Sequence, residues 1–388
     1  MKKFDELINY SVEAVPYYRS NKNLYCNKKY EAIPYLEKSE VKNNSELFVS
    51  DQYNKENMLV NYTSGSTGIP LKIYKSQGDE IRAGKILWDW RRKFAQITPK
   101  DKQVNFFIRR YTKENEIEKS IVIKKKNLLE LSLLNLNEKN IEIFIEAINE
   151  FRPKWIFGPP SVLFILAKHI QSKDINYSFD YLSLIEVSGE FCTKEQRETI
   201  SQVFQTPVAN MYGSMETLMI AYQCPEGHMH IIDDNVLTET NELDEVIVTA
   251  LNNFGMPLIK YKLGDKGCLK EITCPHGNKV IELYGGRVGK YIEYNRQRYS
   301  SAVLFDCIAK YNEKHPKSIG QFKFIRQGQT NFLLEIIIDC DHNSIDIDYL
   351  KVLFYEYFPG SELKVQEVKI INLKNNKISY YVEENFNE

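Results

Sequence analysis

A chain of 388 residues with 43% hydrophobic and 27% charged residues has the composition of an ordinary globular protein. Its formal net charge of −1 gives no reason to expect nucleic acid or an anionic membrane as a partner. No run approaches the ~20 apolar residues of a membrane-spanning helix, and the first residues lack the apolar segment of a secretory signal. We therefore expect a cytoplasmic protein whose seven cysteines are reduced thiols or metal ligands.

The first hundred residues contain predicted helices and two short strands. Residues 3–20, 37–43 and 77–97 show helical patterns. Strand-like runs at Met58–Asn61 and Leu71–Tyr74 enclose a loop rich in serine and glycine. Two strands joined by such a loop are typical of a β-hairpin.

Strands and helices then alternate as far as residue 211. Helices are predicted at 138–151, 162–170 and 194–204, and strands or apolar runs at 104–108, 128–136, 155–158, 182–187 and 207–211. Ser161 is a favoured N-cap for the second of these helices. The alternation predicts α/β layers.

After residue 220 the pattern becomes rich in β-strands, which are predicted at 244–250, 258–261 and 280–283. The last ~100 residues then form an α+β unit large enough to be a domain. Its predicted helices are 301–311 and 346–357, and its strands include 332–339 and 363–371. We place the boundary near Gly289, which gives domains 1–288 and 289–388.

The segment Tyr62–Pro70 is the most distinctive motif of the chain. Gly65 and Gly68 allow positive φ and close approach of the backbone to a ligand, and the N–H and hydroxyl groups around them can bind an anion. The segment is not the usual P-loop, because Lys72 follows Pro70 and a strand, not a helix, comes next. From these residues alone, a phosphate-binding loop and a plain turn both remain open.

Four later segments accompany this loop in a fixed order, namely Ser188-Gly189-Glu190, Met211–Thr217, Tyr261–Asp265 and Gly286–Lys290. Together the five segments resemble the adenylate-forming enzymes, a superfamily of acyl-CoA synthetases and adenylation domains, and in particular its phenylacetate–CoA ligase and CapK-like branch. The resemblance spans Pro16 to Lys377. It implies an α/β fold, in which a large N-terminal adenylation domain with layered α/β and β-rich parts precedes a small, mobile α+β C-terminal domain.

The resemblance implies that the chain binds ATP and Mg²⁺. The loop would hold the β- and γ-phosphates, Glu216 would hold the metal ion, Tyr212 would stack on adenine and Asp265 would bind the ribose. The implied nucleotide contacts are Ser64, Gly65, Ser66, Thr67, Gly68, Lys72, Gly189, Glu190, Asn210, Met211, Tyr212, Gly213, Asp265 and Arg287. Without the resemblance, Tyr212 reads as a core aromatic residue and Asp265 as a turn residue.

The resemblance also assigns a catalytic lysine near the end of the chain. Lys377 would bridge the substrate carboxylate and the α-phosphate, where negative charge builds up in the transition state. The family usually has glycine before this lysine, whereas this chain has Asn376, and Lys374 is the alternative. Gly289 stands where the family has its interdomain hinge, and glycine permits large backbone rotations there.

Cysteines and histidines cluster in two short segments. Cys224 and His230 form a Cys-x5-His pair, and Cys274 and His276 form a Cys-x-His pair, so the four can close a tetrahedral zinc site. His228 is the substitute ligand. Relatives in the branch often carry a cysteine, a histidine and a Cys-x-Cys-Gly pair here, which implies a structural zinc. Two unrelated loops with free thiols are the alternative.

The implied activity is ATP-dependent activation of a carboxylic acid, of the aryl or arylacetic class, followed by transfer to the thiol of CoA or of a carrier protein. The implied acid pocket consists of Phe106, Phe107, Phe157, Gly158, Pro159 and Ser188. Two alternatives stay open: transfer of AMP to a small-molecule acceptor, and a non-catalytic nucleotide-binding protein. The oligomeric state is also open, although dimers are common in the branch.

Overall fold

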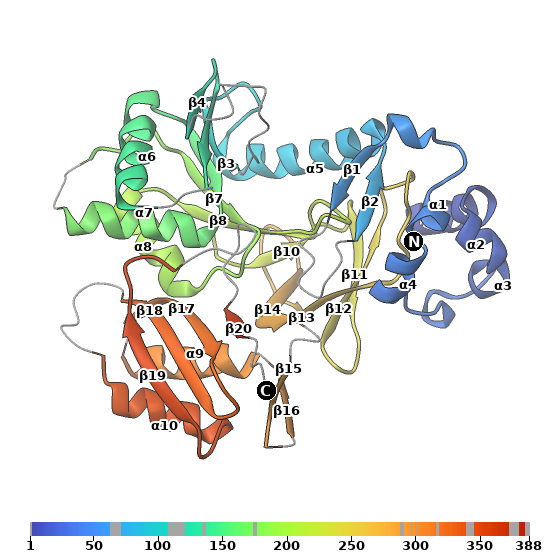
Figure 1. The fold of residues 1–388 in the computed structure, drawn as a ribbon. Coiled ribbons are helices and arrows are strands. Elements are labelled where there is room, and N and C mark those ends of the chain that lie inside the picture. Colours follow the sequence, from blue (N-terminus) through green and yellow to red (C-terminus); the bar gives the residue numbers. More distant parts are fainter. Residues whose placement is uncertain are drawn as a thin grey trace. The chain divides into compact units, whose positions relative to one another are not determined.

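The computed structural model describes residues 2–62, 71–107, 121–133, 137–173, 177–287, 291–295, 297–300, 302–315, 318–338, 345–371 and 380–384 (Figure 1). The chain forms two compact units: a first unit of Met1–Phe94 with Met211–Tyr284, and a second unit of Ala95–Asn210 with Gly285–Glu388. This division differs from the predicted domains 1–288 and 289–388. Gly289 lies outside the described residues, so that boundary stays a prediction.

The first unit begins with short helices packed on a hydrophobic core. Its helices are α1 (Lys2–Ala14), α2 (Pro16–Ser20), α3 (Lys22–Tyr25), α4 (Lys38–Asn43) and α5 (Gln77–Ala95), with 3₁₀ turns η1 (Tyr30–Ala32), η2 (Ser45–Phe48) and η3 (Lys55–Asn57). The helix predicted at 3–20 is broken at Val15, which is extended. Pro16 explains the break, because proline disfavours helical geometry in the residue before it but fits the first turn of a new helix.

Two sheets complete the first unit. Strands β1 (Leu59–Tyr62) and β2 (Lys72–Lys75) pair antiparallel, which confirms the predicted hairpin one residue further along the chain. A larger sheet has the order β11-β12-β13-β14-β10-β9. Its strands are β9 (Ala221–Gln223), β10 (Met229–Ile231), β11 (Val236–Thr240), β12 (Glu245–Ala250), β13 (Tyr261–Glu271) and β14 (Lys279–Arg287).

The strand predicted at 258–261 is wrong, because β13 begins only at Tyr261. Lys260 has a left-handed backbone with φ of 49°, and its N–H donates to the Thr249 hydroxyl at 2.9 Å. The N–H of Ile259 donates to the Tyr18 hydroxyl at 3.1 Å. These buried residues therefore satisfy their N–H groups with side chains and not with a neighbouring strand.

The N-terminal part of the second unit is a parallel sheet with helices, as the strand–helix alternation predicts. The strand order is β7-β6-β3-β5-β4, in which β3, β5, β6 and β7 run parallel and β4 is antiparallel. The strands are β3 (Gln103–Phe107), β4 (Val122–Lys124), β5 (Leu128–Ser132), β6 (Trp155–Gly158) and β7 (Leu184–Ser188), and the helices are α6 (Glu138–Phe151), α7 (Pro160–Ser172) and α8 (Lys194–Phe204). Strand β8 (Val208–Tyr212) contains one of the points at which the chain passes from one unit to the other.

Helix α7 begins earlier than predicted. Its N-cap is Pro159 and Pro160 is its first residue, so Ser161 lies inside the helix, fully buried, and is not the N-cap. Proline suits this position because its missing N–H would have no partner in the first turn of a helix.

The C-terminal part of the second unit is an α+β layer, as predicted. Its four-stranded sheet has the order β19-β18-β17-β20, and helices α9 and α10 pack on it (Figure 1). The elements are β15 (Tyr291–Tyr294), β16 (Gln297–Ser300), α9 (Ala302–Lys314), β17 (Ile319–Arg326), β18 (Asn331–Ile338), α10 (Ile347–Tyr357), β19 (Glu362–Glu367) and β20 (Tyr381–Glu383). Among the helices that the structure describes, none is both long and apolar enough to cross a bilayer.

Candidate functional site

The predicted phosphate-binding loop connects β1 and β2. Residues 63–70, which include Ser64, Gly65, Ser66, Thr67 and Gly68, lie outside the described residues. The strands on either side are described, and Tyr62 is paired with Lys72. Both ends of the loop therefore meet at one end of the hairpin in the first unit.

Lys72, the predicted phosphate-binding lysine, lies beside Tyr74 and Glu46. Its Nζ atom is 4.5 Å from the centre of the Tyr74 ring and 3.5 Å from Glu46 Oε1. The Tyr74 hydroxyl also donates to Glu46, and Lys55 forms an ion pair with it at 2.8 Å. The hydrogen bond from Lys55, followed by that from Tyr74, lowers the pKa of Glu46 to about 2. Lys72 thus already has an anionic partner.

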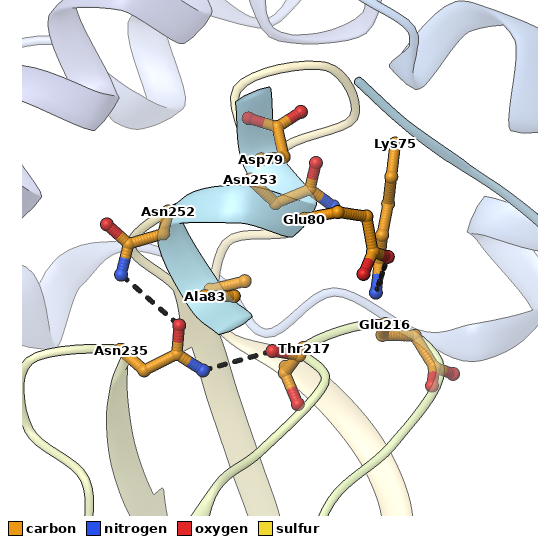
Figure 2. Close-up of a pocket in the computed structure, with 10 residues that line it drawn as sticks. Lys75, Asp79, Glu80, Ala83, Glu216, Thr217, Asn235, Asn252 and Asn253 are labelled. Atoms are coloured by element: carbon orange, nitrogen blue, oxygen red, sulfur yellow. Dashed lines mark hydrogen bonds and ion pairs between the residues drawn. The ribbon is translucent and has the colours of Figure 1, made fainter. Parts of the chain in front are cut away.

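Lys75, at the other end of β2, lies in a pocket together with Glu216 (Figure 2). Its side chain is 6% exposed, and its Nζ atom is 3.1 Å from Glu80 Oε1. The hollow is small, and its free space of about 240 Å³ includes open solvent outside its walls. It is lined by Lys75, Asp79, Glu80, Ala83, Glu216, Thr217, Asn235, Ala250, Asn252 and Asn253. Sequence reasoning missed Lys75 and Glu80.

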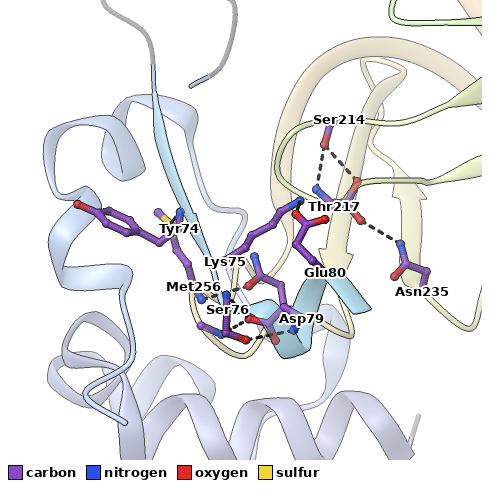
Figure 3. A network of polar contacts seen from close by, with 11 residues as sticks. Tyr74, Lys75, Ser76, Asp79, Glu80, Ser214, Thr217, Asn235 and Met256 are labelled. Carbon is purple, nitrogen blue, oxygen red and sulfur yellow. Dashed lines mark hydrogen bonds and ion pairs between the residues drawn. The ribbon is translucent and has the colours of Figure 1, made fainter. Parts of the chain in front are cut away.

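Asp79 fixes the wall of this pocket where α5 begins (Figure 3). Its buried carboxylate accepts hydrogen bonds from the backbone N–H groups of Ser76, Phe254 and Gly255, each at 3.0 Å. Arg82 donates to the same carboxylate. Asp79 therefore ties the start of α5 to the loop before β13.

Glu216, the predicted magnesium ligand, is 4% exposed and accepts a hydrogen bond from the Tyr261 hydroxyl at 3.1 Å. Hydrogen bonds fix the backbone at the next residue, Thr217. Thr217 N–H donates to the Ser214 hydroxyl at 3.2 Å, and the Asn235 amide donates to the Thr217 carbonyl at 3.0 Å (Figure 3). The structure thus places one oriented carboxylate at the pocket.

Two further predicted nucleotide contacts meet in the first unit. The Tyr212 hydroxyl donates to Asp265 Oδ2 at 3.0 Å. Gly213, which follows Tyr212, allows a close turn, since a Cβ atom there would lie 1.9 Å from the Leu218 carbonyl oxygen. Met211, before Tyr212, is buried in β8.

Other predicted nucleotide contacts lie in the second unit or outside the described residues. Gly189 and Glu190 follow β7, and Glu190 Oε2 accepts a hydrogen bond from the backbone N–H of Ser161 at 3.3 Å. Asn210 lies in β8. Arg287 ends β14, and its side chain is not described. Lys374, Asn376 and Lys377 lie outside the described residues.

The predicted acid pocket falls at the ends of β3, β6 and β7. The Phe106 ring lies against Gly158, where an added Cβ would be 2.5 Å from Phe106 Cδ2. Phe157, Pro159 and Ser188 are partly buried. Phe107 lies in β3, and its side chain is not described. The structure therefore brings Phe106 and Gly158 together.

Three of the four predicted zinc ligands, Cys224, His230 and Cys274, lie together in the first unit, with His228 beside them. The ligand atoms of Cys224, His228, His230 and Cys274 all lie within 4.8 Å of one another. His276 is not in this group, and its Nε2 atom is 3.0 Å from Glu226 Oε2.

Three of the four groups, Cys224, His230 and Cys274, are buried, whereas His228 is exposed, and the buried groups suit a metal ion. His230 is 1% exposed, and neither of its ring nitrogens has a hydrogen-bond partner among the described residues. Burial lowers the pKa of His230 and raises the pKa of Cys224 to about 11. A divalent ion would use the nitrogen of His230 and would stabilise the Cys224 thiolate.

Comparison with known proteins places these features in context. No family model matches the chain. Protein CapK of Staphylococcus aureus is 24% identical over 376 residues, which cover 92% of this chain and 81% of CapK. Indoleacetate–lysine synthetase of Pseudomonas savastanoi is 24% identical over 226 residues, which cover 56% of this chain and 55% of that protein.

The chain is also similar to solved structures. A 2-hydroxyisobutyryl-CoA ligase in the postadenylation state, in complex with R3-HIB-AMP, has a TM-score of 0.72 at 13% identity. The match covers 99% of this chain and 88% of the ligase chain. At this identity the likeness concerns the fold.

Proposed function

Because this chain has the fold of the adenylate-forming ligases, we propose that it activates a carboxylic acid with ATP and then passes the acyl group to a thiol. The observation that supports this most strongly is the hydrogen bond between Tyr212 and Asp265. It joins two motifs that are 53 residues apart in sequence, and it does so in the unit that also holds Glu216.

The proposed reaction begins with attack of a carboxylate oxygen on the α-phosphorus of ATP. A carboxylate–phosphorus bond forms, the bond from the α-phosphorus to the bridging oxygen breaks, and pyrophosphate leaves with that oxygen. Tyr212 and Asp265 would bind adenosine, and Lys377 would neutralise the charge at the reacting phosphate. Mg²⁺, held by Glu216, would supply charge neutralisation for the phosphates.

The second half-reaction transfers the acyl group from AMP to a thiol, and we propose CoA or a carrier protein as its source. The likeness to indoleacetate–lysine synthetase favours a second candidate, in which the amino group of an amino acid accepts the acyl group. Both candidates share the acyl-adenylate. The acid that we propose is of the aryl or arylacetic class, with Phe106 and Gly158 in its pocket, and the proposed location is the cytoplasm.

We also propose a structural zinc ion bound by Cys224, His228, His230 and Cys274. Two thiolates and two imidazoles form a common tetrahedral set for zinc, and four protein ligands leave no open position for catalysis. His276 would stay beside Glu226, outside the coordination sphere.

Pyrophosphate release with a panel of aryl, arylacetic and aliphatic acids tests the proposed activity. We expect release with at least one acid in the presence of ATP and Mg²⁺, and a higher turnover with CoA. Turnover raised by lysine or another amine instead of CoA would favour the amide-forming candidate. Tight ATP binding without release from any acid would contradict the proposal and favour a nucleotide-binding protein.

A further inference from the structure

Two lysines of β2 follow the predicted phosphate-binding loop, and their surroundings differ. Lys72 lies beside the Tyr74 ring and Glu46, whereas Lys75 lies in the pocket that contains Glu216 (Figure 2). We infer that Lys75, and not Lys72, is the lysine that binds the phosphate groups of ATP or pyrophosphate in this chain. The inference rests on the proposed function, because it assumes that the polyphosphate lies beside Glu216.

Lys75 is a buried ammonium group with more N–H donors than ion-pair partners. The residue is 5% exposed. An ammonium group has three N–H donors, and Glu80 is its one ion-pair partner within the described part of the chain. Leaving donors of a buried charged group unused is costly. A ligand with several anionic oxygens could accept from the remaining donors without displacing Glu80.

Asn253 offers a second unused donor in the same pocket. It is 5% exposed, and its Oδ1 atom accepts the Met256 N–H at 3.2 Å, which fixes the orientation of the amide. Its Nδ2 atom has no hydrogen-bond partner among the residues that the structure describes. The pocket thus presents two independent donor groups, Lys75 and Asn253, to a ligand that can accept hydrogen bonds.

The carboxylates of the pocket determine which form of the anion binds. Asp79, Glu80 and Glu216 line it together with Lys75, so three negative charges stand against one positive charge. A free phosphate group would be repelled by this balance. A phosphate group bound to Mg²⁺ would not be repelled, because carboxylates and phosphates together are the usual ligands of that ion. Binding should therefore require magnesium as well as Lys75.

Calorimetric titration of the whole protein with inorganic pyrophosphate, with and without Mg²⁺, tests the inference. In Mg²⁺ we expect Lys75→Met to weaken pyrophosphate binding about tenfold or more, the loss typical of a hydrogen bond between charged groups. Lys72→Met is the matched control on the same strand and should change the affinity by less than about threefold. Lys75→Arg should restore part of the affinity, because it keeps the charge and the donors.

Variants of Glu80 separate phosphate binding from folding. Glu80→Gln removes one of the negative charges that repel the phosphate groups, so pyrophosphate should bind more tightly than to the wild type. The double variant Lys75→Met/Glu80→Gln leaves no unpaired charge, and thermal unfolding verifies that it folds. Loss of binding in this folded double variant supports the inference. Wild-type affinity in the double variant, or loss of binding in Lys72→Met alone, overturns it.

The same titration separates this inference from the proposed function. If wild-type protein releases no pyrophosphate with any acid but binds pyrophosphate through Lys75, the proposed activity fails and the inference stands. If the Lys75→Met variant releases pyrophosphate from ATP with the same kinetics as the wild type, the activity stands and the inference fails. Wild-type protein that does not bind pyrophosphate in Mg²⁺ also contradicts the inference.

Discussion

At the scale of single residues, the most informative contact is the one between Tyr212 and Asp265. Both are predicted nucleotide contacts, but the sequence does not show that they touch. The hydroxyl of Tyr212 donates to Asp265 Oδ2 at 3.0 Å, which holds the carboxylate in one orientation. An oriented carboxylate suits the binding of vicinal ribose hydroxyls, as in dinucleotide-binding sites.

Tyr212→Phe therefore tests whether this contact orients Asp265 for the nucleotide. The variant keeps the ring and removes the hydroxyl, so we expect the KM for ATP to rise about three- to tenfold, with a smaller change in kcat. Pyrophosphate release measured against ATP concentration gives both constants. Tyr10→Phe, which removes a hydroxyl bonded to Ser50, is the control and should leave the KM unchanged. An unchanged KM in Tyr212→Phe would contradict the role of this contact.

The residues that the structure groups differently from the sequence analysis, or that the sequence analysis missed, have physical explanations. Spacing alone cannot choose between His228 and His276, because each lies within a few residues of other candidate ligands. The turn that carries His228 puts it near Cys224, whose N–H bonds to the His228 carbonyl at 2.9 Å. Strand residues at odd spacing face opposite sides of the strand. Lys75 is three positions after Lys72, so the sequence already indicates that the two lysines have different surroundings.

At the scale of elements, the start of α5 depends on Asp79. The sequence predicts this helix well, at 77–97 against Gln77–Ala95 in the structure, because its pattern is long and periodic. The sequence does not show that Asp79 also accepts two backbone N–H groups 175 and 176 residues away. This bond network holds β2, α5 and the loop before β13 around the Lys75 pocket.

Asp79→Asn should therefore destabilise the first unit. An amide has one acceptor oxygen where the carboxylate has two, so at least one buried N–H loses its partner, at a cost of about 1–3 kcal/mol. Urea unfolding followed by circular dichroism measures this loss. Asp89→Asn on the same helix is the control, because Asp89 is 53% exposed in its ion pair and should change stability by less than about 1 kcal/mol. Equal losses of stability in the two variants would show that the buried hydrogen bonds of Asp79 contribute no more than an exposed ion pair.

The element boundaries that differ from the sequence-based predictions depend on the backbone and not on which side chains are buried. Periodicity reports which side chains are buried, but it does not report where backbone N–H groups find acceptors. Residues 258–260 are buried like a strand, yet the N–H groups of Ile259 and Lys260 bond to side chains. Helices α2 and α7 begin at Pro16 and Pro160, because proline fits the first turn of a helix. Proline in the sequence therefore indicates both of these helix starts.

At the scale of the whole molecule, each compact unit combines distant segments of the chain. The sequence predicted the classes of structure in order, but the grouping of 1–94 with 211–284 depends on long-range packing. The cysteine and histidine cluster lies within this grouping. The ring centroids of Trp90 in α5 and His230 in the cluster are 6.3 Å apart, and those of Phe94 in α5 and His276, which lies outside the cluster, are 4.8 Å apart.

A bound zinc ion would therefore stabilise the whole first unit. It would link the turn between β9 and β10 to the turn between β13 and β14, under the aromatic residues of α5. We expect purified protein to contain about one zinc per chain, and chelation to lower the Tm by roughly 5–10 °C. Zinc analysis by mass spectrometry and thermal unfolding with and without chelator measure these two quantities.

A matched pair of histidine variants decides which ligand set binds this zinc. His228→Ala should lose the metal and the associated stability, because His228 belongs to the cluster of ligand atoms. His276→Ala should keep both, because its Nε2 atom pairs with Glu226. The opposite result, with zinc lost only in His276→Ala, would restore the set expected from sequence and show that binding rearranges the turn. Wild-type protein without zinc would remove the link altogether, and the packing of α5 would then have to hold the two turns together without a metal.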